Sequence, residues 1–283
     1  MTQQSKISLA IKSSHTAISM GQSIILEAQL DVPGGSPSDY ILLPFVNQRR
    51  WGSHERPDAS GKAAFLLPLP NPGIAHIRVI ALKSDSDDWM GLKNIDILLV
   101  GVLMPEADIC SNKLEVEVSW RNFPARQSAG SLFGIQWESW FCGGAARWKT
   151  SQAVPVVGIY DSYNRDVTRQ HILWFMDLGV DFIMPDWSNH IWGCKHWDER
   201  GDGVNAIDHG TQLALEVLAD MRSEGLDVPK MVLMPGISNG PPATMEALNE
   251  ELLWIYHNYV RNPRFTGLFQ EFEGKPLVVV LDT

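Results

Sequence analysis

The sequence contains few cysteines, and their arrangement argues against a disulfide-stapled fold. Its 283 residues include three, Cys110, Cys142 and Cys194, which are widely spaced and odd in number. A disulfide framework needs an even set of cysteines at regular spacings. We therefore predict small buried or half-buried thiols, in a fold that depends on its apolar core.

Long apolar runs and an N-terminal leader are absent as well. No stretch reaches the about 20 apolar residues that span a bilayer, and residues 1–6 have no apolar segment of the kind that a secretory signal needs. These absences predict that a membrane is not a partner. They place the chain in the cytoplasm as written, or make it secreted or periplasmic if a leader is missing.

Positive charge is scarce. The chain has 23 Lys and Arg against 33 Asp and Glu, which gives a net charge of −10. Nucleic-acid binding needs a basic face, so we predict that the protein does not bind nucleic acid. An electroneutral partner fits better, and we expect an oligosaccharide or polysaccharide. The oligomeric state stays open.

Three motifs that would indicate other chemistries are missing. No Gly-rich phosphate loop follows the first buried strand of the C-terminal half, and no serine lies in a nucleophile elbow. The cysteines and histidines lack a recognised zinc spacing. We therefore predict no cofactor and no metal.

The first half of the chain, residues 1–125, has the pattern of an all-β domain. Short alternating or β-branched runs are separated by turn clusters such as "LPNPG", and several short strands at this spacing predict an immunoglobulin-like β-sandwich. The expected strands are Ile7–Ile11, Ser23–Leu30, Ala64–Leu69, Ile74–Leu82, Ile95–Val102 and Leu114–Trp120.

In residues 126–283, apolar strands alternate with amphipathic helices. Helices are expected from a cap at Asn164 to a glycine stop at Gly179, over Ala206–Ser223 with a glycine stop at Gly225, and over residues 244–260. Buried strands are expected over residues 132–137, 180–185, 230–236 and 275–283. This alternation predicts parallel strands covered by helices. An open doubly wound sheet and a (β/α)8 TIM barrel both fit, and the missing phosphate loop favours the barrel.

The ends of the first two expected strands carry the candidate chemistry. One runs into Trp137-Glu138-Ser139-Trp140 and the other into Asp186-Trp187-Ser188-Asn189. Barrel active sites lie at such carboxyl ends. Glu138 and Asp186 would be neighbours there, and glycoside hydrolysis needs two carboxyl groups. We predict them as a catalytic pair, with sugar contact alone as the alternative.

The tryptophans add a second signal. Seven of the eleven fall between Trp137 and Trp197, and a dense cluster of indoles often lines a wet cleft. Each could equally be a core residue. The expected substrate-binding residues, at strand ends or in loops, are Trp137, Trp140, Tyr160, Asp161, Trp187, Asn189, His190, Trp192 and Asp282.

Three segments together resemble glycoside hydrolase family 71/99-like proteins, relatives of endo-α-mannosidases and α-glucanases. They are "GIQWESWF", "PVVGIYDSYNRDVTRQHILWFMDLGVDFIMPDWSNHIWG" and "LNEELLWIYHNYVRNPRFTGLFQEFEGKPLVVVL". The similarity covers residues 131–283 and implies a (β/α)8 barrel that acts on α-linked glycans.

The same resemblance implies an incomplete barrel. A barrel takes about 250 residues and eight strands, whereas four strands are expected here. The family's late Asn-Glu-Trp-x-Glu stretch has no counterpart, so its catalytic carboxylates cannot be assigned. We expect a truncated glycosidase, with a non-catalytic carbohydrate-binding protein as the alternative and an adhesion protein working through its sandwich as a third.

Overall fold

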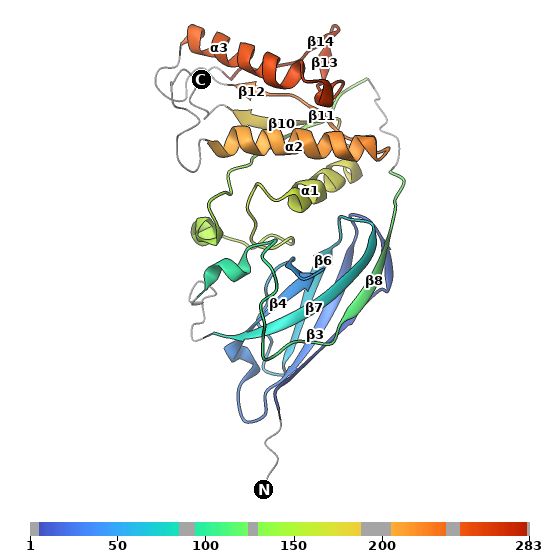
Figure 1. The fold of residues 1–283 in the computed structure, drawn as a ribbon, viewed down its shortest axis with the longest axis vertical. Coiled ribbons are helices and arrows are strands. Elements are labelled where there is room, and N and C mark those ends of the chain that lie inside the picture. The colour runs from blue at the N-terminus through green and yellow to red at the C-terminus, as the bar shows by residue number, and fades with distance from the viewer. Residues whose placement is uncertain (1–5, 85–93, 124–129, 188–204, 236–243, 282–283) are drawn as a thin grey trace. The chain divides into compact units, whose positions relative to one another are not determined.

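The computed structural model describes the chain in five stretches, residues 6–84, 94–123, 130–187, 205–235 and 244–281 (Figure 1). Their contacts define two compact units. The first comprises the described parts of residues 1–121 and 143–164, and the second those of residues 122–142 and 165–283.

Two β-sheets make up the first unit (Figure 1). The three-stranded sheet is antiparallel, in the order β1 (Ser8–Ser13), β3 (Ser23–Asp31), β6 (Lys62–Pro68). The five-stranded sheet has the order β2 (Ala17–Ser19), β8 (Leu114–Ser119), β7 (Gly73–Lys83), β4 (Tyr40–Val46), β5 (Arg49–Arg50), and its β2–β8 pair is parallel. The described residues of this unit also form the 3-10 helices η1 (Pro37–Asp39), η3 (Ile95–Leu98) and η4 (Ala145–Thr150).

Alternating burial along several strands builds much of the core of this unit. In β3, Ile24 and Leu26 are fully buried, whereas Ile25 between them is 50% exposed. In β7, Ile77 and Val79 are likewise buried, and Arg78 between them faces solvent. Successive side chains of a strand point to opposite faces of its sheet, so these strands bury one face, whereas β4 is buried on both faces from Tyr40 to Phe45. This is the pattern of a β-sandwich.

Two local expectations for this unit were wrong. Residues 95–102 are not a strand, because Ile95–Leu98 forms the 3-10 helix η3. Conversely, Tyr40–Val46 was not expected as a strand but forms β4, between β7 and β5. Pro44 concealed it, because proline lacks a ladder donor and is rare in central strands. Its carbonyl still accepts a hydrogen bond from Trp51 N.

The second unit alternates parallel strands with helices. Its sheet has the order β9 (Gly134–Trp137), β10 (Phe182–Trp187), then β11 (Lys230–Met231) and β12 (Met234–Pro235). The helices are α1 (Arg165–Asp177), α2 (Asn205–Ser223) and α3 (Met245–Ile255). After α3 come the π turn η6 (Tyr256–Val260), the 3-10 helix η7 (Pro263–Phe265) and the hairpin of β13 (Glu271–Phe272) and β14 (Lys275–Pro276).

The expected first half of a (β/α)8 barrel is wrong. Within the described stretches the second unit has three α-helices, and its sheet is open rather than closed. Residues 277–281 extend the sheet beyond β12, since Val279 N donates to Leu233 O at 3.0 Å. β9 forms the opposite edge. A barrel needs a ring of paired strands with a fixed stagger, and this short sheet does not supply one.

The two helix stops predicted from glycine are confirmed. Gly179 after α1 and Gly225 after α2 have φ of 71° and 91°. Such left-handed residues just beyond a helix let later N–H groups reach back to its last carbonyls. Val180 N donates to Phe175 O at 2.9 Å, and Leu226 N to Met221 O at 3.1 Å.

Trp187, the last residue of β10, anchors the helices to the sheet. Its side chain is fully buried, and its Nε1 donates to Thr211 Oγ1 on α2 at 2.9 Å. The ring centroids of Trp254 and Tyr259 lie 6.3 and 6.1 Å away. Thr211 Oγ1 donates in turn to Ile207 O at 2.8 Å. The indole therefore has both its apolar area and its N–H satisfied in the core.

Thr211→Val tests this anchor. Valine keeps the shape but leaves the indole N–H unpaired in the core, so we expect the free energy of unfolding to fall by about 1–3 kcal/mol. Urea unfolding followed by circular dichroism measures it. In a Trp187→Phe background the same substitution should cost much less, because no indole N–H remains. An equal cost in both backgrounds would contradict the role of the hydrogen bond.

Candidate functional site

The candidate site is a polar cluster at the carboxyl ends of β9 and β10. Trp137 and Pro185 are register partners on these parallel strands. Glu138 directly follows Trp137 at the end of β9, and Asp186 directly follows Pro185 in β10. These two residues therefore lie side by side at the carboxyl ends of the strands. In open parallel sheets, ligands bind at the carboxyl ends of the strands.

One amide joins the two carboxyl groups. Gln136 Nε2 donates to Glu138 Oε1 at 2.9 Å and to Asp186 Oδ2 at 2.8 Å. An amide nitrogen carries two hydrogens, so each carboxyl group can receive one of them. Three side chains from two adjacent strands thus form one cluster, which we call the carboxyl pair site (Gln136, Glu138 and Asp186).

The electrostatics of the site differ from those of a solvated carboxylate. Burial raises the pKa of the Glu138 carboxyl, the charge of nearby Asp186 raises this pKa further, and the hydrogen bond from Gln136 opposes the shift. Asp186 is only 9% exposed. Glu138 Oε2 is buried and has no hydrogen-bond partner within the described residues. The site therefore holds an acceptor that a ligand hydroxyl could use.

Helix α2 packs directly behind this cluster. A Cβ added to Gly210 of α2 would lie 2.4 Å from both Cβ and Oγ of Ser139, the residue after Glu138. Ser139 itself is 4% exposed. The absence of a side chain at Gly210 therefore allows the close approach of α2 to the segment that carries Glu138.

Sequence reasoning missed Gln136, although it brings the two carboxyl groups together. It lies within the run "LFGIQW", which the sequence indicates as a buried strand, and a lone amide there gave no signal of a site. Its position two residues before Glu138 was the available signal, because residues i and i+2 of a strand share one face.

The expected tryptophans of this unit have unequal roles. Trp187 is fully buried and packs against the helices, so its indole is not open to a ligand. Trp137 is partly buried. Trp140 is 45% exposed and lies two residues after Glu138 in the chain. Of the three, Trp140 presents the most indole surface to solvent.

Tyr160 and Asp161 belong to the first unit. Burial raises the pKa of Tyr160 to about 12, and its ring lies edge-on to Trp148 at a centroid distance of 5.0 Å. The Asp161 carboxylate accepts hydrogen bonds from Tyr163 N at 2.9 Å and Gly143 N at 3.2 Å. Both residues therefore serve local structure, and Asp161 organises a turn.

The remaining expected site residues are not part of the described structure. Asn189, His190, Trp192 and Asp282 all lie outside the described residues.

In the stretches that are described, no three His, Cys, Asp or Glu side chains cluster as they would around a metal ion. Among the described helices, none is long and apolar enough to cross a membrane.

Comparison with known proteins finds no family for this chain. No family model matches it, and no curated protein matches it. Among solved structures, the CARDB domain of a Pyrococcus furiosus protein, solved with di-metal ions, is 13% identical with a TM-score of 0.27. That match covers 43% of this chain and 100% of the domain.

Two further solved structures give similar values. A solution structure of the same CARDB domain is 12% identical with a TM-score of 0.26, over 41% of this chain and 95% of that one. The D0–D1 domain of intimin is 18% identical with a TM-score of 0.26, over 41% of this chain and 51% of that one.

The expected membership of glycoside hydrolase family 71/99 is wrong. No family model and no curated protein matches the chain, and the described sheet of the second unit is open rather than a barrel. The hydrolase activity was expected only from this resemblance, and it stays an untested prediction. The carboxyl pair site stands independently, because it rests on the geometry of β9 and β10.

Glu138→Gln tests the electrostatics of the site. The folded-state pKa of Glu138 is raised, so its protonated form is favoured in the fold, and the stability it contributes is lost as pH rises through that pKa. We expect the free energy of unfolding of the wild type, relative to the variant, to fall between pH 4 and pH 7. Urea unfolding at both pH values measures this, with Glu250→Gln on α3 as the control for one lost charge. A constant or growing difference would contradict the raised pKa.

Proposed function

We propose that the carboxyl pair site binds a neutral oligosaccharide and that the protein is a carbohydrate-binding protein without a catalytic role for the pair. The observation that carries this proposal is the bridging of Glu138 and Asp186 by the Gln136 amide at the carboxyl ends of adjacent strands.

Sugar hydroxyls suit this set of groups. A hydroxyl both donates and accepts hydrogen bonds, carboxylate oxygens accept them, and an amide does both. Glu138 Oε2 is a buried acceptor with no partner among the described residues, so a donor from a ligand would satisfy it. Hydrogen bonds to charged groups are worth about 1.5–3 kcal/mol each, which is enough to orient a small ligand.

Two further features support a neutral sugar. The net charge of −10 disfavours anionic ligands near a carboxyl pair. Trp140, close to Glu138 in the chain and 45% exposed, offers an aromatic surface to the apolar face of a sugar ring. Oligosaccharides of α-linked mannose or glucose are the first candidates, and the proposal concerns binding alone.

The test is a titration of the full chain with α-mannan and α-glucan oligosaccharides by isothermal calorimetry. We expect saturable binding that Asp186→Asn weakens roughly ten-fold or more, because one hydrogen bond to a charged group is lost. The matched control is Asp181→Asn, at the other end of β10, where the carboxylate accepts from Phe133 N at 2.8 Å. The Asp181→Asn variant should bind the oligosaccharides with the same affinity as the wild type.

Two results would count against the proposal. One is a folded protein that gives no saturable heat with either class of oligosaccharide. The other is an equal loss of affinity in Asp186→Asn and Asp181→Asn, which would show a general effect on the sheet rather than a contact at the carboxyl pair site.

A further inference from the structure

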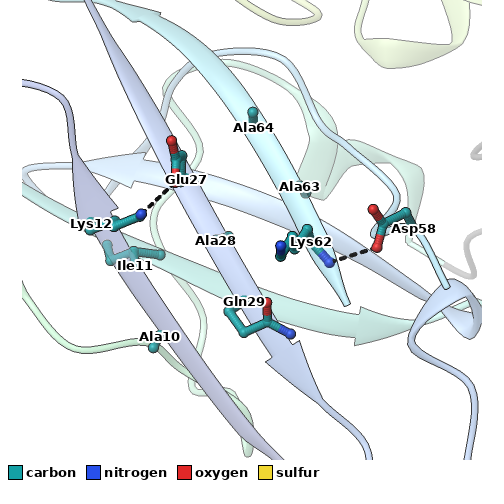
Figure 2. A pocket seen from close by; sticks show the side chains of 10 residues that line it. All are labelled: Ala10, Ile11, Lys12, Glu27, Ala28, Gln29, Asp58, Lys62, Ala63 and Ala64. Atoms are coloured by element: carbon teal, nitrogen blue, oxygen red, sulfur yellow. Dashed lines mark hydrogen bonds and ion pairs between the residues drawn. The ribbon is translucent and has the colours of Figure 1, made fainter. Parts of the chain in front are cut away.

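Two hollows on sheet faces of the first unit differ in charge balance. The larger, of about 760 Å³, lies on the three-stranded sheet. Figure 2 shows two contacts among its charged residues: Lys12 Nζ lies 2.8 Å from Glu27 Oε2, and Asp58 Oδ1 accepts a hydrogen bond from the backbone N–H of Lys62 at 3.0 Å. Its lining includes two lysines and two acidic residues, so the charges balance and do not favour a charged ligand.

The smaller hollow, of about 540 Å³, lies on the five-stranded sheet. We call it the cationic hollow, and its lining includes Asn47, Gln48, His76, Arg78, Met104 and Lys113. Its volume falls in the range of small-molecule sites, about 300–1,000 Å³. No acidic residue is among its lining residues, in contrast to the larger hollow.

Arg78 is the unbalanced charge of the cationic hollow. Within the described residues it makes no ion pair, and its Nη1 donates a hydrogen bond to Cys110 Sγ at 3.6 Å. The nearby acid, Glu115, already pairs with Lys113 Nζ at 2.9 Å and His76 Nδ1 at 3.3 Å. The hollow therefore keeps about one uncompensated positive charge on a protein whose net charge is −10.

One wall of the hollow is held in a strained turn. Asn47 and Gln48 link β4 to β5 with φ of 50° and 65°. Two-residue hairpins of this kind favour glycine at the second position, yet a glutamine stands there. Asn47 Oδ1 accepts from His76 N at 3.0 Å, and Gln48 O accepts from Met104 N at 2.7 Å. The turn is thus fixed, and Gln48 adds an amide to the lining.

We propose that the cationic hollow binds a small organic monocarboxylate. The Arg78 guanidinium would hold the carboxylate by two parallel hydrogen bonds, with Gln48 as a further donor and Met104 against the apolar part of the ligand. A single uncompensated charge matches a monoanion better than a doubly charged phosphate. This site is separate from the carboxyl pair site, and neither proposal depends on the other.

The experiment follows backbone amide shifts in nuclear magnetic resonance spectra of the full chain during titration with benzoate, benzamide and inorganic phosphate. We expect saturable shifts along β7 and at residues 47–48 with benzoate, and none with benzamide, which has the same shape without the charge. Arg78→Gln should weaken benzoate binding at least ten-fold. The matched control is Lys12→Gln in the larger hollow, which should leave the affinity for benzoate unchanged.

A second variant separates binding from stability. Gln48→Gly suits the left-handed turn, so its unfolding midpoint should not fall, whereas its affinity for benzoate should. The proposal is overturned if benzoate and benzamide behave alike, if phosphate binds more tightly than benzoate, if benzoate gives no saturable shift, or if Arg78→Gln binds as the wild type does.

Discussion

The two-residue period of β10 is the constraint on which the second unit depends. Asp186 and Trp187 are adjacent in the chain, so their side chains leave opposite faces of the sheet. The tryptophan face packs against α2, Trp254 of α3 and Tyr259 of η6. The aspartate face joins Gln136 and Glu138. Trp187 therefore packs in the core on one face of the sheet, while its neighbour Asp186 belongs to the carboxyl pair site on the other face.

Parts of this arrangement could be predicted from sequence, and the reasons for the rest are physical. The helix stops at Gly179 and Gly225 are local backbone effects, so they were readable. The placement of Glu138 beside Asp186 followed from strand ends that meet at one edge. The burial of Trp187 could not be predicted, because a tryptophan at the end of a strand can pack in the core or stack on a ligand, and the sequence does not distinguish the two. β4 was not predicted either, because it contains Pro44 and proline is rare in central strands.

The mistaken barrel has a related cause. Apolar strands, amphipathic helices and polar strand ends are what any parallel sheet with helices requires, and they set neither strand number nor closure. Short motifs drawn from such elements therefore resemble a barrel family without sharing its architecture. The bridging role of Gln136 was missed because it depends on the pairing of β9 with β10. Gln136 and Asp186 are 50 residues apart in the chain, so their contact is not visible in the sequence.

The closeness of Gly210 to Ser139 has a consequence for how the second unit can move. A helix that rotates by one residue turns by about 100° and advances about 1.5 Å, which would bring His209 or Thr211 against Ser139 in place of a bare backbone. No space exists there even for a methyl group. Helix α2 is therefore locked in phase with the segment bearing Glu138, so any displacement of the helix is passed directly to the carboxyl pair site.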